Sequence, residues 1–127
     1  MKQQYFCIVD TETTIDNKVI DFAAVIVDRR GKIYDSIAVI VKDLELSTLW
    51  YNEKTGFFNA ANLERRIKNY NTMLDDGRRV IASVGAINRW LDKCITLYNP
   101  TLTAYNLTFD SEKCSNTGII LDGFTNR

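Results

Sequence analysis

Two carboxylates near the front of the chain have the spacing of a metal site. Asp10 and Glu12 follow a short apolar run, residues 5–9, whose composition is typical of a strand buried on both faces. Residues two apart on a strand share a face and lie about 7 Å apart along the backbone, so both carboxylates can converge on one cation. Oxygen-only ligands favour Mg²⁺ or Mn²⁺ over zinc. The alternative is an exposed strand-end pair of solvated carboxylates.

The local sequence offers this pair no positive charge. Carboxylates held about 4 Å apart repel by roughly 4 kcal/mol at an effective dielectric near 20, so they need a cation, a proton or a basic partner. Residues 9–16 contain no Lys or Arg, and the chain has no His. The lack of His excludes His-based zinc sites and His general bases within this chain.

The overall composition predicts one globular domain spanning residues 1–127. The chain has 46% hydrophobic and 25% charged residues, and its 16 basic residues balance its 16 acidic ones, so any nucleic-acid-binding surface must be local. No stretch is apolar for long enough to cross a bilayer and no signal peptide is evident, so we expect an intracellular, cytoplasmic protein. Three cysteines without paired spacing are expected to be buried free thiols: Cys7, Cys94 and Cys114.

The apolar pattern predicts an antiparallel unit of three strands at the N-terminal end. The first strand, residues 5–9, ends at Asp10, and a second apolar run covers residues 19–27. A polar turn with glycine at residues 28–32 leads to a third run, residues 33–41, which completes a β-hairpin. Connections this short require antiparallel pairing, because a parallel return needs a crossover.

Helices and shorter strands are predicted in the remainder of the chain. One amphipathic helix starts at an Asn59 cap, ends at Asp76-Gly77 and presents Leu63, Ile67, Tyr70 and Leu74. A second helix runs up to Asn99-Pro100 with an apolar face of Val80, Val84, Ile87, Leu91 and Cys94 or Ile95. A fourth strand is expected at residues 102–105, then a short helix that Thr108 or Asp110 opens and Gly118 closes. Residues 119–121 are expected to begin a fifth strand.

Two segments together resemble a known enzyme superfamily. Residues 8–14 read IVDTETT and residues 19–25 read VIDFAAV, which is similar to the first motif of the DEDD 3′–5′ exonucleases, the group that includes proofreading exonucleases and RNase T. Asp21 stands where that family commonly has Glu. Residues 103–110, TAYNLTFD, resemble the family's second motif, with Tyr105 in place of the usual His and Asp110 as the third acid.

The resemblance runs from Tyr5 to about Gly118 and lacks the family's third motif. That motif carries His or Tyr and, a few residues later, a fourth acid, whereas the residues after Asp110 contain no His or Tyr and only two acids, Glu112 and Asp122. The implied fold is α/β: a ribonuclease-H-like mixed sheet with an N-terminal antiparallel three-strand unit and flanking helices, incomplete at its C-terminal side.

The function implied by the resemblance is two-metal phosphodiester hydrolysis at the 3′ ends of single-stranded DNA or RNA, with two Mg²⁺ or Mn²⁺ ions. Asp10 would bridge both ions, and Glu12 and Asp110 would each take one. The substrate-binding residues would be Thr11, Thr13 and Thr14, through their backbone, and Asn106. Without the fourth acid and the His or Tyr, weak or no turnover is expected.

Other interpretations stay open from the sequence. The pairs Trp50-Tyr51 and Phe57-Phe58 fit base stacking or core packing. Several basic residues fit phosphate contacts or a solvated helix face: Arg65, Arg66, Lys68, Arg78 and Arg79. The chain is also compatible with a non-catalytic nucleic-acid- or protein-binding module of exonuclease ancestry. Residues 10–14, DTETT, also resemble the signature of haloacid-dehalogenase-like phosphatases, although a hairpin fits that parallel fold poorly.

Overall fold

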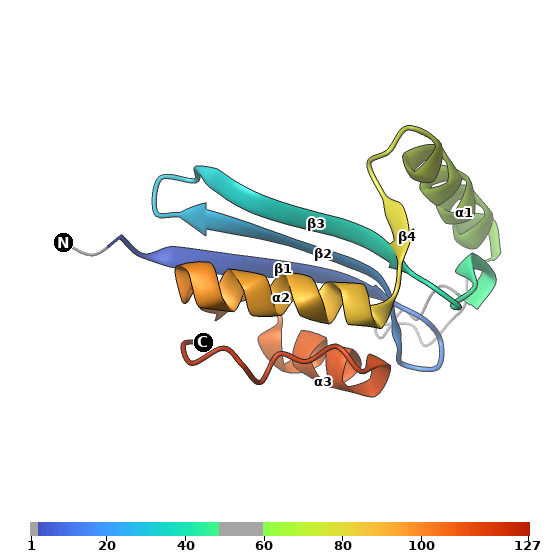
Figure 1. Ribbon diagram of the computed structural model, residues 1–127. Helices are drawn as coiled ribbons and strands as arrows, with labels where there is room; N and C mark the ends of the chain where they lie inside the picture. Colours follow the sequence, from blue (N-terminus) through green and yellow to red (C-terminus); the bar gives the residue numbers. More distant parts are fainter. Residues whose placement is uncertain (1–2, 49–59) are drawn as a thin grey trace.

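The computed structural model describes residues 3–48 and 60–127 (Figure 1). These residues form an α/β structure with a five-stranded mixed sheet in the order β4-β3-β2-β1-β5 and three α-helices. In this described part, no helix is long and apolar enough to cross a membrane.

The central strands form the antiparallel unit that the sequence predicts. β1 (Tyr5–Thr13) pairs with β2 (Val19–Asp28), which pairs in turn with β3 (Ile33–Val41). The β2–β3 turn contains Gly31 at φ 84, a left-handed conformation that glycine adopts without strain. The bounds predicted for the second and third strands are confirmed to within one residue.

The predictions for β1 need two corrections. The strand does not end at Asp10 but continues to Thr13, because Glu12 stays paired with Asp21 on β2. It is also not buried on both faces: Cys7 and Val9 are buried, whereas Ile8 between them is 42% exposed. Asp10 and Glu12 therefore lie within a paired strand, on the face opposite to Cys7 and Val9.

Two helices cover the face of the sheet that carries Cys7 and Val9. α2 (Val84–Tyr98) and α3 (Leu107–Thr117) lie on the same side of the strands in Figure 1. The main core joins buried side chains of the strands and both helices, among them Cys7, Phe22, Val39, Leu91 and Cys114. Asn99 ends α2 in the left-handed conformation at φ 43, a common helix C-cap. The predicted end of this helix at Asn99-Pro100 is therefore confirmed.

Short parallel strands flank the antiparallel unit. β4 (Val80–Ala82) pairs with β3, and β5 (Thr101–Thr103) pairs with β1. Val80 was predicted on the second helix, which is wrong: that helix begins only after Ser83, whose side chain accepts a hydrogen bond from the Ala86 N–H. β5 stops at Thr103 rather than at residue 105.

The fifth strand predicted at residues 119–121 is also wrong. Gly118, at φ 90, closes α3 as predicted, but the residues after it form no strand and run back beside α2, where the Ile120 N–H donates to the side chain of Asn88. Instead, Asn126 makes an isolated parallel bridge to Thr101, and its carbonyl accepts from the Leu102 N–H.

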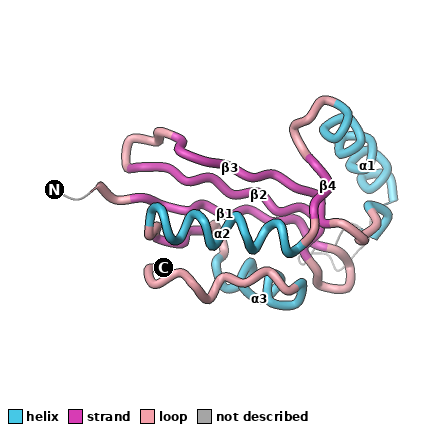
Figure 2. Tube along the Cα trace, viewed as in Figure 1, coloured by secondary structure: helices cyan, strands magenta, loops and turns pink. Residues whose placement is uncertain are grey.

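The remaining helix builds a second, smaller core. α1 (Ala60–Asp75) follows the 3₁₀ turn η1 (Leu46–Thr48) and lies beyond one end of the sheet, near β4 (Figure 2). Tyr70 packs with Ile20 and Ile40, and Leu63, Met73 and Leu74 pack around them. Ile40 is paired with Asp21, so α1 covers the end of the face that carries Glu12 and Asp21. The Asn59 cap predicted for this helix lies outside the described residues.

Candidate metal and nucleic-acid site

Asp10 and Glu12 point to the same face of the sheet, and α1 covers one end of this face. Asp10 is opposite Ala23 and Glu12 is opposite Asp21, so all four residues point to this face. Asp10 is exposed, and Glu12 is partly buried beside α1. The register of β1 with β2 therefore confirms the prediction that Asp10 and Glu12 share a face.

Asp110 approaches the same strand from the other side of the sheet. Asn106 begins α3: its side-chain oxygen accepts a hydrogen bond from the Phe109 N–H at 3.3 Å, and its backbone carbonyl accepts one from the Asp110 N–H at 3.0 Å. Asp110 is 7% exposed, and its Oδ1 accepts a hydrogen bond from the Thr11 hydroxyl at 2.5 Å. The third acid is thereby fixed to the residue between the first two.

The short length of β5 makes this approach possible. β5 pairs with β1 only from Phe6 to Ile8, so among the described residues no strand lies beside Asp10 and Glu12 on the β5 side of β1, whereas β2 pairs with both on the other side. The N-terminal turn of α3 fills this position instead and brings Asp110 there. Asp110 therefore reaches β1 at Thr11, between Asp10 and Glu12, on the side of the strand where β5 has ended and α3 begins.

The electrostatics of the three carboxylates are coupled. Burial raises the pKa of Glu12, the Arg66 guanidinium opposes this shift, and the charges of Asp10 and Asp21 add to it. Burial also raises the pKa of Asp110, the hydrogen bond from Thr11 opposes the shift, and the charge of Asp10 again adds to it. Negative charge from Asp10 therefore disfavours ionisation of both other acids, and a bound cation would relieve this repulsion.

A basic partner for Glu12 comes from α1. Nη1 of Arg66 lies 3.2 Å from Oε2 of Glu12, and each side chain is about one-third exposed, at 34% and 36%. From the sequence, Arg66 is expected only to contact phosphate or to lie on a solvated helix face, and not to pair with Glu12. A signal was present: Arg66 stands four residues before Tyr70, so it shares the face that Tyr70 turns toward the sheet.

Asp21 is held differently, by two partners in the interior. Its Oδ2 accepts a hydrogen bond from the Tyr70 hydroxyl at 2.7 Å, and its Oδ1 pairs with Nε of Arg79 at 3.1 Å. The side chain of Asp21 is 7% exposed. Burial raises the pKa of Tyr70, and the neighbouring Asp21 charge raises it further, so the phenol stays protonated and donates. This carboxylate serves to fix α1 and β4 to the sheet.

The turn between β1 and β2 is attached to α3. Nζ of Lys113 donates to Oδ1 of Asn17 at 3.0 Å, and the Asn116 amide donates to the Asn17 carbonyl at 3.1 Å. The Val19 N–H donates to the Thr117 hydroxyl at 2.7 Å. Asn17 has φ 65, which Asn tolerates better than most residues. These bonds hold α3 beside β1 at a second point and so keep Asp110 near Thr11.

The predicted substrate-binding residues are mostly engaged within the protein. The hydroxyl of Thr11 binds Asp110, and the side chains of Thr13 and Thr14 are buried at 6% and 0% exposure. The Thr14 N–H donates to the Lys18 carbonyl at 2.8 Å. Asn106 caps α3. Thr13 and Thr14 are buried as whole residues, and the Thr14 carbonyl accepts a hydrogen bond from the Asn17 N–H at 3.2 Å, so neither residue offers a nucleic acid an exposed surface.

Other candidates from the sequence lie apart from the site. The side chain of Asp122 is 98% exposed and 3.8 Å from Arg127, and Glu112 is exposed next to Lys113. The pairs Trp50-Tyr51 and Phe57-Phe58 lie outside the described residues. The three cysteines are buried free thiols, as predicted. Burial raises the pKa of Cys7 and Cys114 to about 12 and that of Cys94 to about 11, so none is a nucleophile at neutral pH.

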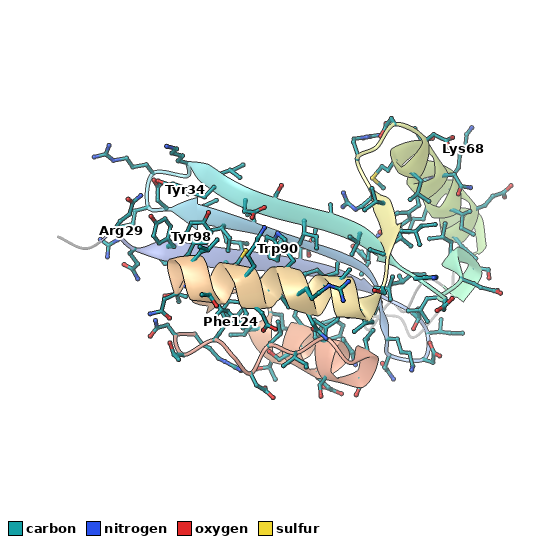
Figure 3. All side chains as sticks on the ribbon, in the orientation of Figure 1. Arg29, Tyr34, Lys68, Trp90, Tyr98 and Phe124 are labelled. Carbon is teal, nitrogen blue, oxygen red and sulfur yellow. The ribbon has the colours of Figure 1, made fainter. Side chains whose placement is uncertain are left out.

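A polar hollow at the opposite end of β1 does not include the acids. Its volume is about 740 Å³, and its lining contains Gln3, Tyr5, Tyr98 and Arg127. The rings of Tyr5 and Tyr98 lie 5.0 Å apart, and Tyr34 packs against both. Tyr34 and Tyr98 are labelled in Figure 3. The side chains that line the hollow are amides, phenols, hydroxyls and the Arg127 guanidinium, without a carboxylate, so the acidic end of the strand is the candidate for a metal site.

The donor set of the acidic end fits a hard cation, but the three acids are not gathered around one point. Asp10, Glu12 and Asp110 supply only carboxylate oxygens, the donors that Mg²⁺ and Mn²⁺ take. In the residues that the structure describes, no three acidic, thiol or imidazole side chains are grouped closely enough to hold a metal ion. Glu12 faces Arg66 and Asp110 faces Thr11, so binding a shared ion requires these two side chains to turn toward Asp10.

Comparison with known proteins adds no relative. No family model, no curated protein and no solved structure matches the chain.

Proposed function

We propose that this chain is a domain of the DEDD 3′–5′ exonuclease type, a metal-dependent phosphodiesterase acting on the ends of single-stranded nucleic acid. The observation that carries the proposal is the placement of Asp110, which the hydrogen bond from Thr11 attaches to the strand between Asp10 and Glu12. Residues that are about a hundred positions apart, and that resemble two separate motifs, thereby come to one strand edge. An incidental similarity of two short motifs gives no reason for this proximity.

The strand order supports a ribonuclease-H-like fold for the proposed domain. Three antiparallel strands in the order β3-β2-β1, followed by the parallel β5 beside β1 and the acid-bearing α3, agree with the order expected from the resemblance. The parallel bridge at Asn126 places a further segment beside β5. The antiparallel pairing of β1 with β2 over its full length favours this fold over a haloacid-dehalogenase-like one, where the nucleophile-bearing strand has parallel neighbours.

In the proposed reaction, Asp10, Glu12 and Asp110 would hold Mg²⁺ or Mn²⁺. The metal, when bound, supplies Lewis acidity toward the phosphate and lowers the pKa of a water molecule. The chain's own contribution is to bring the three carboxylates to one strand: β1 carries Asp10 and Glu12, and the Thr11 hydroxyl attaches Asp110 to the residue between them. No His is present to act as a general base, and Tyr105, at the position of the family's second-motif His, is fully exposed, so we propose slow turnover.

A second candidate is a non-catalytic nucleic-acid-binding module of the same ancestry. The observation that favours it is the pairing of Glu12 with Arg66, because a carboxylate with a guanidinium partner is not available as a metal ligand until the pair opens. This candidate predicts binding of single strands without cleavage under any cation.

One assay separates the two candidates. A 5′-labelled single-stranded oligonucleotide is incubated with the chain and Mg²⁺ or Mn²⁺, and its products are resolved by length. The exonuclease proposal predicts stepwise shortening from the 3′ end that Asp10→Ala abolishes and Asp92→Asn, an exposed site on α2, leaves intact. Shortening that persists in Asp10→Ala contradicts the exonuclease proposal. Affinity without shortening supports the binding module.

A further inference from the structure

The ion pair between Arg66 and Glu12 is weak enough to open readily. Its two side chains are about one-third exposed, and the distance of 3.2 Å joins one nitrogen to one carboxylate oxygen. Ion pairs of this exposure contribute at most about 1 kcal/mol, because water competes for both charges. A cation that binds Glu12 can therefore displace the guanidinium at little cost.

The other arginine near this edge has a different environment. Arg79 is 22% exposed, and its partner Asp21 is 7% exposed and also accepts a hydrogen bond from Tyr70. Opening this pair would leave a buried carboxylate without its cation, which is strongly unfavourable. Of Arg66 and Arg79, Arg66 is thus the one whose ion pair can exchange.

A displaced Arg66 would lie beside the reacting phosphate. The guanidinium is a planar set of donors that matches phosphate as well as carboxylate, and it stays charged at any pH the protein experiences. Its position next to Glu12 places it within one side-chain movement of any group that the carboxylates and their cation hold. The chain has no net charge, so a local cation at this point matters for attracting a polyanion.

We propose that Arg66 contacts a phosphate of the single strand. Without a cation, the guanidinium of Arg66 pairs with Glu12 instead; a cation that binds Glu12 breaks this pair and lets the guanidinium contact the phosphate. This inference rests on the proposed function, because it assumes that the acidic edge receives nucleic acid. It assigns the specific role of exchangeable ligand to Arg66 and predicts that Glu12 and Arg66 are coupled in binding nucleic acid even without cation.

A double-mutant cycle in chelator tests the coupling. The affinity for a short fluorescein-labelled oligothymidylate is measured by anisotropy for the wild type, Glu12→Gln, Arg66→Met and the double variant. Because Glu12→Gln removes the carboxylate that pairs with Arg66, it should tighten binding about threefold to tenfold. In the Arg66→Met background the same change should have little effect. An equal gain in both backgrounds would mean that only the loss of a negative charge matters, and it would overturn the inference.

Lys68 provides the matched control. It lies two residues from Arg66 on α1, which is about 200° around the helix, and its side chain points away from the sheet (Figure 3). Lys68→Met removes the same charge from the same helix, and the tightening by Glu12→Gln should persist in that background. If Lys68→Met abolishes it as Arg66→Met does, the effect belongs to the charge of the helix and the inference fails.

Added Mn²⁺ gives a second readout with an oligothymidylate whose phosphorothioate linkages resist cleavage. With the cation on Glu12, Arg66→Met should weaken binding about tenfold and reduce the salt slope of the affinity by about 0.7, the value for one phosphate contact on a single strand. An unchanged slope contradicts a phosphate contact. Coupling in the cycle together with no cleavage of ordinary strands would overturn the proposed exonuclease activity but support the role of Arg66, so the two failures are distinguishable.

Discussion

The Thr11 hydroxyl donates a hydrogen bond to Oδ1 of Asp110, with 2.5 Å between the two oxygens, and joins the central strand to α3. The donor and the acceptor are 99 residues apart in the chain. Because Asp110 is buried and carries the site's third carboxylate, this bond affects both the stability of the protein and the position of the acid.

Replacing Thr11 with Val should lower stability. The substitution preserves shape but leaves the buried carboxylate of Asp110 without its hydroxyl donor, which costs about 2 kcal/mol. Urea unfolding monitored by circular dichroism measures the loss. Thr103→Val is the control, because Thr103 is exposed on β5 and its hydroxyl donates to the Thr101 carbonyl at the long distance of 3.5 Å. Equal losses for the two variants would contradict the structural role of the Thr11 bond.

Stability should depend on pH through Asp110. Burial and the Asp10 charge raise its pKa in the folded state above the ordinary value of 3.8, so protonation favours folding. This stabilisation is complete below 3.8 and is lost as the pH rises through the higher folded-state pKa. Asp110→Asn, which is neutral throughout and can still accept from Thr11, should therefore be more stable than the wild type at about pH 7.

The difference between Asp110→Asn and the wild type should shrink as the pH falls toward 3.8 and vanish below it. Urea unfolding of both proteins across this range measures it. A wild type that is more stable than Asp110→Asn at neutral pH would contradict the direction of the pKa shift.

Arg79 should contribute far more to stability than its neighbour Arg78. Arg79→Met leaves the buried Asp21 carboxylate hydrogen-bonded to Tyr70 but without its cation, and should cost about 3 kcal/mol, the lower end of values for a broken buried pair. Arg78 pairs with Asp76 at 2.8 Å, but both side chains are exposed, at 61% and 44%, so Arg78→Met should have no measurable effect. Similar midpoints of urea unfolding for the two variants would contradict the proposed role of Asp21 in fixing α1 and β4.

Asn106 should stabilise α3 as its N-cap and, as a proposed substrate-binding residue, should also contribute to the binding of single strands. Asn106→Ala removes the bond to the Phe109 N–H and should cost about 1 kcal/mol, whereas Asn106→Ser keeps a capping oxygen and should cost little. Thermal unfolding measures this part. An unchanged affinity of Asn106→Ser for single strands would show that the residue serves α3 alone.

The sequence predicted the elements whose signals are local. The apolar runs of β2 and β3 are bounded by polar turns, and the end of α2 is marked by Asn99 and Pro100, so these bounds could be placed. β4 was missed because Val80 and Ile81 also fit the apolar face of the helix that follows, and only the pairing with Val39 and Ile40 identifies them as a strand. The local sequence of residues 80–82 fits either a strand or the start of a helix, and their pairing with β3 determines that they form a strand.

The site was predictable as a set of acids but not as a set of contacts. The spacing of Asp10 and Glu12 indicated a shared face, which the register of β1 with β2 gives. The pairing of Arg66 with Glu12 depends on where α1 packs, and 54 residues separate the two side chains in the chain. Nothing local indicates such a contact, since it arises from the small core around Tyr70.

The most direct test of the account is the binding of Mn²⁺ to the chain, measured by isothermal titration calorimetry at about pH 7. The wild type should bind Mn²⁺, and Asp10→Asn, Glu12→Gln and Asp110→Asn should each weaken this binding at least about tenfold, as expected for lost carboxylate ligands. Asp92→Asn, on the exposed side of α2, should bind as the wild type does. A wild type that binds no Mn²⁺, or an Asp10→Asn variant that binds it equally well, would contradict the assignment of this strand edge as a metal site.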